Sequence, residues 1–173
     1  RPAPLVLTSF PQPGCSALRG REVGGRAVPV TRRRGVGGTL MAWLVGAGYI
    51  AASGSHRIML CERGIRTFET AYRNVLDVTA VAVLKRETHL PVIVDPSHAG
   101  GKAWMVPALS CAAIAAGADG LLIEIHPNPC EALCDADQAL TPAAFPTLQQ
   151  PAHAIPRSIG RGIGTAPAAS RRP

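Results

Sequence analysis

The chain has 173 residues, 47% of them hydrophobic, which is enough for one domain with a sizeable core. No run approaches the ~18 uncharged apolar residues of a membrane span, so we expect no membrane partner. The formal net charge of +7 would suit nucleic-acid binding, but residues 1–35 hold seven arginines and one acid, and residues 146–173 hold four arginines and no acid. The segment between them is acidic overall, and the basic ends offer few aromatic side chains to stack on bases. We therefore keep nucleic-acid binding only as an alternative.

The two ends of the chain also differ from its centre in composition. Residues 1–27 are rich in Arg, Pro and Gly and are predicted to be irregular, and residues 149–173 are predicted to be a disordered basic tail. Residues 28–148 form the predicted domain. The five cysteines have no CxxC spacing and indicate neither a disulfide framework nor a zinc ribbon: Cys15, Cys61, Cys111, Cys130 and Cys134. We expect a reduced, cytoplasmic compartment, since no secretory signal is visible either.

Four short apolar runs predict the buried strands of a parallel sheet: Val28–Arg33, Arg57–Cys61, Pro91–Asp95 and Leu121–Ile125. Helical spacing of apolar residues predicts helices between these runs, with Thr39 as an N-cap before the first of them. A further helix is predicted to begin at Thr141-Pro142. Strands that alternate with helices form parallel βα units, so we expect an α/β fold.

Polar side chains stand where two of these strands end. Asp95 and His98 follow the third apolar run, Glu124 lies inside the fourth, and Asp135 comes eleven residues later. Chemistry in α/β folds sits at the C-terminal ends of strands, and a buried carboxylate is costly unless it is paired or bound to a cation. One imidazole and two carboxylates suit Mn, Fe, Co or Zn. The alternative is a histidine that only hydrogen-bonds its own loop.

Several stretches stand in the order and at the spacing of one enzyme family: Leu60–Glu69, Arg73–Asp77, His89–His98, Glu124–Pro129, Ala132–Asp135 and Gln138–Leu140. They resemble the class I synthases of 3-deoxy-D-arabino-heptulosonate 7-phosphate (DAHP), the first enzymes of the shikimate pathway. The resemblance covers residues 29–145. It implies a TIM barrel, a (β/α)8 fold that typically needs about 250 residues. We therefore expect a partial barrel of about the last four βα units, with irregular ends.

The resemblance also implies a reaction and a set of site residues. Phosphoenolpyruvate would condense with erythrose 4-phosphate in an aldol-type step that depends on a divalent metal ion (Mn, Fe, Co or Zn). His98, Glu124 and Asp135 would be the metal ligands, and Asp95 would orient groups around them, as His126 could at the end of its own strand.

Several basic residues match positions at which the family binds its substrates. Arg63 matches an arginine that binds the phosphate of phosphoenolpyruvate, a pairing that a guanidinium makes bidentately. Arg33 stands where the family has a lysine that contacts the same substrate, and Arg34 matches the arginine that follows it. Lys102 stands where relatives carry an arginine and could reach a substrate phosphate, or it could be a surface lysine. We expect Arg33, Asp95 and His98 to be the catalytic residues.

Part of the family pattern has no counterpart here. The metal-binding cysteine and the Lys-Pro-Arg-Thr-Ser segment of the first half-barrel are not recognisable in residues 1–28, and Cys15 lies too close to Arg33 to replace that cysteine. We expect the chain alone to be impaired or inactive, and its open sheet edges to favour pairing with another chain, including a homo-oligomer. Two alternatives stay open: a 3-deoxy-octulosonate 8-phosphate synthase-like enzyme, and a basic nucleic-acid-binding protein.

Overall fold

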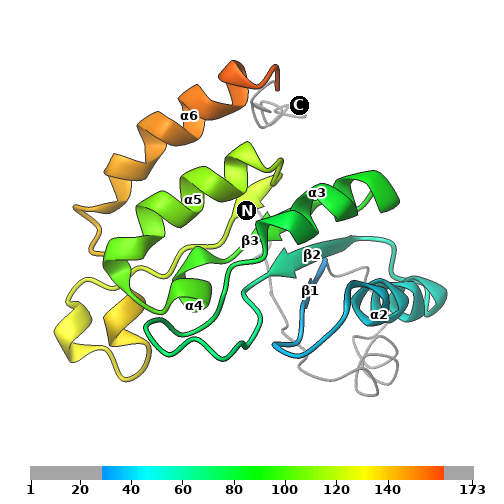
Figure 1. Ribbon diagram of the computed structural model, residues 1–173, viewed down its shortest axis with the longest axis horizontal. Helices are drawn as coiled ribbons and strands as arrows, with labels where there is room; N and C mark the ends of the chain where they lie inside the picture. Colours follow the sequence, from blue (N-terminus) through cyan, green and yellow to red (C-terminus); the bar gives the residue numbers. More distant parts are fainter. Residues whose placement is uncertain (1–28, 162–173) are drawn as a thin grey trace, which may run out of the picture.

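A computed structural model describes residues 29–161 as a parallel sheet with helices packed against it (Figure 1). The strands are β1 (Val30–Arg33), β2 (Ile58–Glu62), β3 (Val92–Val94) and β4 (Gly120–Leu121). The helices are α2 (Leu40–Ala52), α3 (Val78–Glu87), α4 (Pro96–Gly100), α5 (Val106–Ala115) and α6 (Gln149–Ser158). Short 3₁₀ helices lie in the connections: η2 (Ala103–Met105), η3 (Pro129–Glu131), η4 (Ala136–Gln138) and η5 (Phe145–Leu148).

The four strands are hydrogen-bonded in the order β1-β2-β3-β4, and each neighbouring pair is parallel. Each strand reaches the next through helical structure: α2 follows β1, α3 follows β2, and α4 and α5 follow β3. A chain that returns in this way after every strand builds consecutive βα units, as a TIM barrel does. The predicted α/β fold, a partial barrel, is confirmed.

The strand predicted at Leu121–Ile125 is shorter in the structure, where β4 ends at Leu121 and Ile125 forms only an isolated parallel bridge with Leu140. Three residues later, Glu124 N donates to the Ser97 hydroxyl of α4 at 3.0 Å rather than to a strand. A side chain thus replaces the backbone partner of Glu124 N, while Glu124 O still accepts from Leu140 N at 2.9 Å.

Helices α2, α3 and α5 cover one face of the sheet. Their apolar side chains form the core together with alternate strand residues: Trp43, Ala47, Ile50, Ile58, Leu60, Val81, Leu84, Val92, Val94, Ala113 and Ala118. Because successive strand residues point to opposite faces, Cys61 and Asp95 lie on the face turned away from these helices. That second face, at the strand ends, is where the candidate site residues gather.

Side-chain caps determine where the first two long helices begin. Thr39 Oγ1 accepts from Ala42 N at 3.2 Å at the start of α2, as its predicted N-cap role requires. Asp77 Oδ1 accepts from Ala80 N at 3.0 Å at the start of α3. Local sequence therefore fixes the point at which the chain turns from each strand-end loop into a helix.

The prediction of a disordered tail is wrong for residues 149–158, which form α6. Ala152, Ile155 and Pro156 are half-buried on one side of this helix, which lies along α5 (Figure 1). The alanines and prolines suggested an unstructured segment, but at helical spacing they supply apolar surface for packing.

Thr141 Oγ1 accepts from Ala144 N at 3.2 Å, but a turn and η5 follow, so the helix predicted to begin there begins only at Gln149. The irregular segment predicted at residues 1–27 and the tail beyond residue 161 lie outside the described residues. Between residues 29 and 161, no helix has the length and apolar character that crossing a membrane requires.

A buried ion pair joins the ends of β1 and β2 to the start of α3. Arg34 Nη1 donates to Glu62 Oε2 at 3.1 Å and to Asp77 Oδ2 at 2.7 Å, and Arg34 Nε donates to Gly38 O at 3.0 Å. Glu62 is fully buried, and burial raises the pKa of its carboxyl despite the opposing hydrogen bond from Gly64 N and the charge of Arg34. Glu62 therefore depends on Arg34 for its charge partner.

Removing that partner is expected to destabilise the fold. The Arg34→Met substitution leaves a buried carboxylate unpaired, which should lower the free energy of unfolding by about 3–5 kcal/mol. Urea denaturation followed by circular dichroism measures the change. Arg86→Met, at an exposed position in the last turn of α3, is the control and should cost less than about 1 kcal/mol. Equal denaturation midpoints for Arg34→Met and the unsubstituted chain would contradict this account.

Candidate metal centre

His98 is held by the aspartate that begins its own short helix. Asp95 Oδ1 accepts from His98 N at 3.0 Å as the N-cap of α4, and Pro96 occupies the first turn, where no backbone N–H is needed. The same carboxylate contacts the ring, with His98 Nδ1 3.0 Å from Oδ1 and 2.8 Å from Oδ2. Asp95 is fully buried, so the ring is anchored from inside and Nε2 is turned toward the remaining site residues.

Two carboxylates approach His98 Nε2 from the segment that follows β4. Glu124 Oε2 lies 3.6 Å from Nε2, and Asp135 Oδ2 lies 3.7 Å from it. Asp135 has a left-handed backbone, with φ of 56°, a conformation that Asp adopts more readily than most residues. One ligand atom from each of the three residues can be chosen so that all lie within 4.8 Å of one another.

This arrangement fits a divalent metal ion. Atoms bound at about 2.0–2.2 Å to one ion lie roughly 3–4 Å apart, close to the separations found here. The exposed fractions of the three side chains are 14% for His98, 32% for Glu124 and 27% for Asp135, so an ion and a substrate could enter from solvent. The structure brings together all three residues that were expected to be ligands.

Two arginines lie on the same face of the sheet and have no acidic partner among residues 29–161. Arg33 ends β1 and pairs in register with Cys61, and Arg63 follows β2. Burial raises the pKa of the Cys61 thiol to about 12, with a further rise from Asp95 and an opposing influence from the two arginines. Arg63 Nε is buried and makes no hydrogen bond to a described residue. These cations therefore remain available for an anionic ligand.

Arg34 and Lys102 are placed differently. The guanidinium of Arg34 donates hydrogen bonds to Glu62, Asp77 and Gly38 O. Arg34 is therefore part of the packing between the strand ends and α3. Lys102 Nζ donates to Asp137 Oδ2 at 2.6 Å, and 47% of the Lys102 side chain is exposed. An exposed pair of this kind is weakly held.

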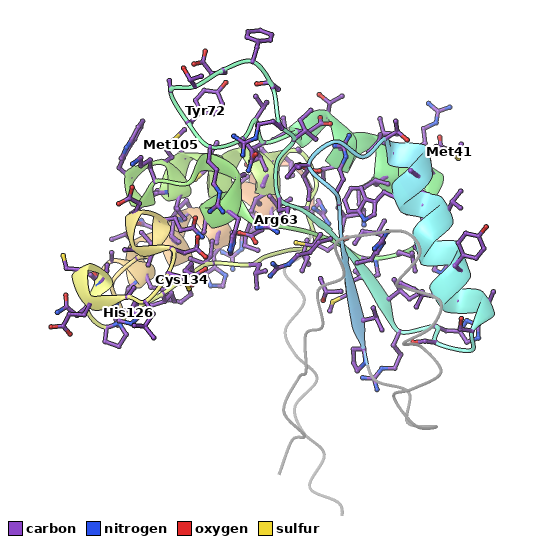
Figure 2. All side chains as sticks on the ribbon, turned by 90° about the horizontal axis from the view of Figure 1, so that it is seen from below. Met41, Arg63, Tyr72, Met105, His126 and Cys134 are labelled. Carbon is purple, nitrogen blue, oxygen red and sulfur yellow. The ribbon has the colours of Figure 1, made fainter. Side chains whose placement is uncertain are left out.

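His126 lies at the periphery of the molecule, whereas Arg63 lies toward its centre (Figure 2). His126 Nδ1 accepts from Asn128 N at 3.1 Å, a contact within its own turn.

No role was predicted from the sequence for Arg73, Gln138 or Ser97. In the structure Arg73 contacts the carboxylate of Asp135, Gln138 that of Glu124, and Ser97 accepts from Glu124 N. Arg73 and Gln138 lie in stretches that resemble the family, and this resemblance was the only indication in the sequence that they belong to the site.

The parallel βα units, with candidate ligands gathered at the C-terminal strand ends, define part of a (β/α)8 barrel with a site in the usual place for that fold. Residues 16–155 match the model of the DAHP synthetase I family, a wider span than the predicted domain at 28–148. The chain belongs to this family.

Curated relatives support this family membership. The chain is 48% identical over 132 residues to a phospho-2-dehydro-3-deoxyheptonate aldolase of Thermotoga maritima, a match that covers 76% of this chain and 39% of that protein. It is 42% identical over 103 residues to a 2-dehydro-3-deoxyphosphooctonate aldolase of Syntrophotalea carbinolica, which covers 53% of this chain and 36% of that protein. The chain thus spans less than half the length of the curated relatives it matches.

Solved structures show the same likeness. A truncated form of DAHP synthase from Thermotoga maritima superposes with a TM-score of 0.81 at 42% identity, covering 91% of this chain and 61% of that one. A second structure from the same organism, also titled as a DAHP synthase, has the same score and identity and is covered over 47% of its length.

The packing of β2 beneath the site can be tested through the cysteines. Cys61 is fully buried and its pKa of about 12 leaves almost no thiolate at pH 8, whereas Cys130 and Cys134 are exposed. Iodoacetamide at pH 8, followed by peptide mass spectrometry, should label Cys130 and Cys134 and spare Cys61 until the protein is unfolded. Labelling of Cys61 in the folded protein as fast as Cys134 would show that β2 is not packed as described.

Proposed function

We propose that this chain carries the metal-binding part of a DAHP synthase active site. In that reaction phosphoenolpyruvate condenses with erythrose 4-phosphate and inorganic phosphate is released. The observation that carries the proposal is the approach of His98, Glu124 and Asp135, with ligand atoms within 4.8 Å of one another. Membership of the DAHP synthetase I family supports this choice of reaction.

The three ligands suit Mn, Fe, Co or Zn, because an imidazole and two carboxylates form a donor set of intermediate hardness. A divalent ion bound there supplies Lewis acidity toward the aldehyde oxygen of erythrose 4-phosphate. Asp95 keeps the imidazole proton on Nδ1 of His98, so that Nε2 presents its lone pair to the ion. Asp95 thus acts through His98.

Arg63 and Arg33 hold phosphoenolpyruvate in this proposal. The support is that neither has an acidic partner among the described residues and that Arg63 Nε is buried without a hydrogen bond. A buried donor of this kind is costly unless a ligand satisfies it, and guanidinium groups match phosphate and carboxylate geometry. Lys102 can leave its exposed contact with Asp137 to reach a substrate phosphate, whereas Arg34 supports the site through packing rather than through substrate contact.

Catalysis also needs the rest of a barrel. Within residues 29–161 the sheet has four strands, with β1 and β4 at its edges, whereas a closed barrel has eight. We infer that this chain by itself is impaired or inactive and that the remaining strands come from another polypeptide or segment, a homo-oligomer being one arrangement.

A cytoplasmic location belongs to the same proposal, since the four cysteines among the described residues are free.

Metal binding is the first test of this function. The full chain should bind one Mn²⁺, measured by calorimetric titration, and His98→Ala should weaken binding by more than about 100-fold, because it removes a ligand itself. His126→Ala is the matched control and should bind Mn²⁺ as the unsubstituted chain does. Equal weakening by both substitutions would contradict the assignment of His98.

Any loss of phosphoenolpyruvate in the presence of erythrose 4-phosphate should stop when EDTA removes the metal.

Substrate binding is tested separately from metal binding. Arg63→Met should weaken phosphoenolpyruvate binding by about 10–100-fold, the effect of losing a charge-assisted hydrogen bond, while Mn²⁺ binding stays unchanged. Calorimetric titration in the presence of Mn²⁺ measures both constants, with Arg86→Met as the control for loss of one positive charge. Unchanged phosphoenolpyruvate affinity in Arg63→Met would remove Arg63 from the substrate site.

A further inference from the structure

Arg73 and Gln138 connect the two carboxylates of the candidate metal centre. Arg73 Nη1 donates to Asp135 Oδ1 at 3.0 Å and to Gln138 Oε1 at 2.7 Å. The amide of Gln138 then reaches the other carboxylate, with Nε2 3.5 Å from Glu124 Oε2. Gln138 is 1% exposed, so bulk solvent does not compete for its amide. One continuous chain of hydrogen bonds therefore runs from Asp135 to Glu124.

We propose that Arg73 and Gln138 are positioning residues that hold Glu124 and Asp135 at chelating distance before a metal ion binds. The proposal rests on the metal site put forward above and adds two residues that do not touch the ion. Two carboxylates that face one another repel, and without a shared donor their side chains would spread into solvent. Groups that hydrogen-bond metal ligands orient them, and losing such a group typically costs 10–100-fold in metal affinity.

The backbone around Arg73 is itself attached to α4, the helix that carries His98. Arg73 N donates to Gly100 O at 3.2 Å, and Asn74 N donates to Ala99 O at 2.9 Å. Gly101 makes this approach possible, since a Cβ at that position would lie 2.6 Å from Arg73 Cβ and the glycine has a φ of +72°. The position of Arg73 is therefore set by the same helix that carries His98. All three candidate ligands are thus positioned relative to α4.

Charge and position predict opposite effects for Arg73. A positive charge near the site opposes the binding of a cation, so a purely electrostatic role predicts tighter metal binding when Arg73 is removed. The Arg73 side chain is 42% exposed, and solvent screens its charge. The loss of the bridge between the carboxylates should therefore outweigh the relief of repulsion, and binding should weaken.

The test uses full-length variants and Mn²⁺ as the probe. Gln138→Met keeps every charge and removes both amide contacts, the one from Arg73 and the one to Glu124. Arg73→Lys keeps the charge but shortens the side chain, which withdraws the donor, Nη1, that joins Asp135 and Gln138. We expect each to weaken Mn²⁺ binding by about 10–100-fold, measured by electron paramagnetic resonance of the free ion. The spectrum of the bound ion should also change, while Arg86→Met leaves both readouts unchanged.

Melting temperatures without metal separate positioning from folding. If Arg73 is a positioning residue, the melting temperature of Arg73→Lys lies within a few degrees of that of the unsubstituted chain, while its affinity for Mn²⁺ is lower. If Gln138→Met does not fold, Arg73→Lys decides the question, because its side chain is exposed. Unchanged affinity in Arg73→Lys, or tighter binding in Arg73→Met, overturns the positioning role. A lack of Mn²⁺ binding by the unsubstituted chain overturns the proposed metal site and this inference together.

Discussion

The carboxylate of Asp95 is the group on which the candidate site depends. It caps α4 through His98 N and contacts the His98 ring through Nδ1, so one buried side chain sets both the helix and the direction of Nε2. The same helix also positions the other candidate ligands, since Ser97 accepts from the backbone of Glu124 and Gly100 O accepts from the backbone of Arg73, which contacts Asp135. A five-residue helix thus determines where an imidazole and two carboxylates meet.

The arginines at the strand ends differ in whether an acidic side chain pairs with them. Arg34 is buried with Glu62 and Asp77 and contributes to the fold. Arg33 and Arg63 lie near Cys61 on the opposite face and have no acidic partner among residues 29–161. A cation that the fold does not neutralise is available to a phosphate or carboxylate, which is the chemical reason for proposing that these two residues bind phosphoenolpyruvate.

Much of this arrangement follows from local sequence, and some of it does not. Apolar runs and caps predicted the first three strands and the helices between them, because each signal acts within a few residues. The path of the chain after β4 was not predictable, since Glu124 N donates to the hydroxyl of Ser97, which belongs to a distant segment. Helix α6 was missed because its stability comes from packing on α5 rather than from its composition. The link from Arg73 to Gln138 spans 65 residues and becomes visible only in three dimensions.

We propose that His98, Glu124 and Asp135, whose ligand atoms lie within 4.8 Å of one another, share one divalent ion. The most direct measurement is an anomalous difference map from crystals of the full chain grown with Mn²⁺. We predict a single strong peak about 2.0–2.2 Å from His98 Nε2, with an oxygen of Glu124 and an oxygen of Asp135 at similar distances. A peak elsewhere in the molecule, or no peak within reach of His98 at saturating Mn²⁺, would contradict the account.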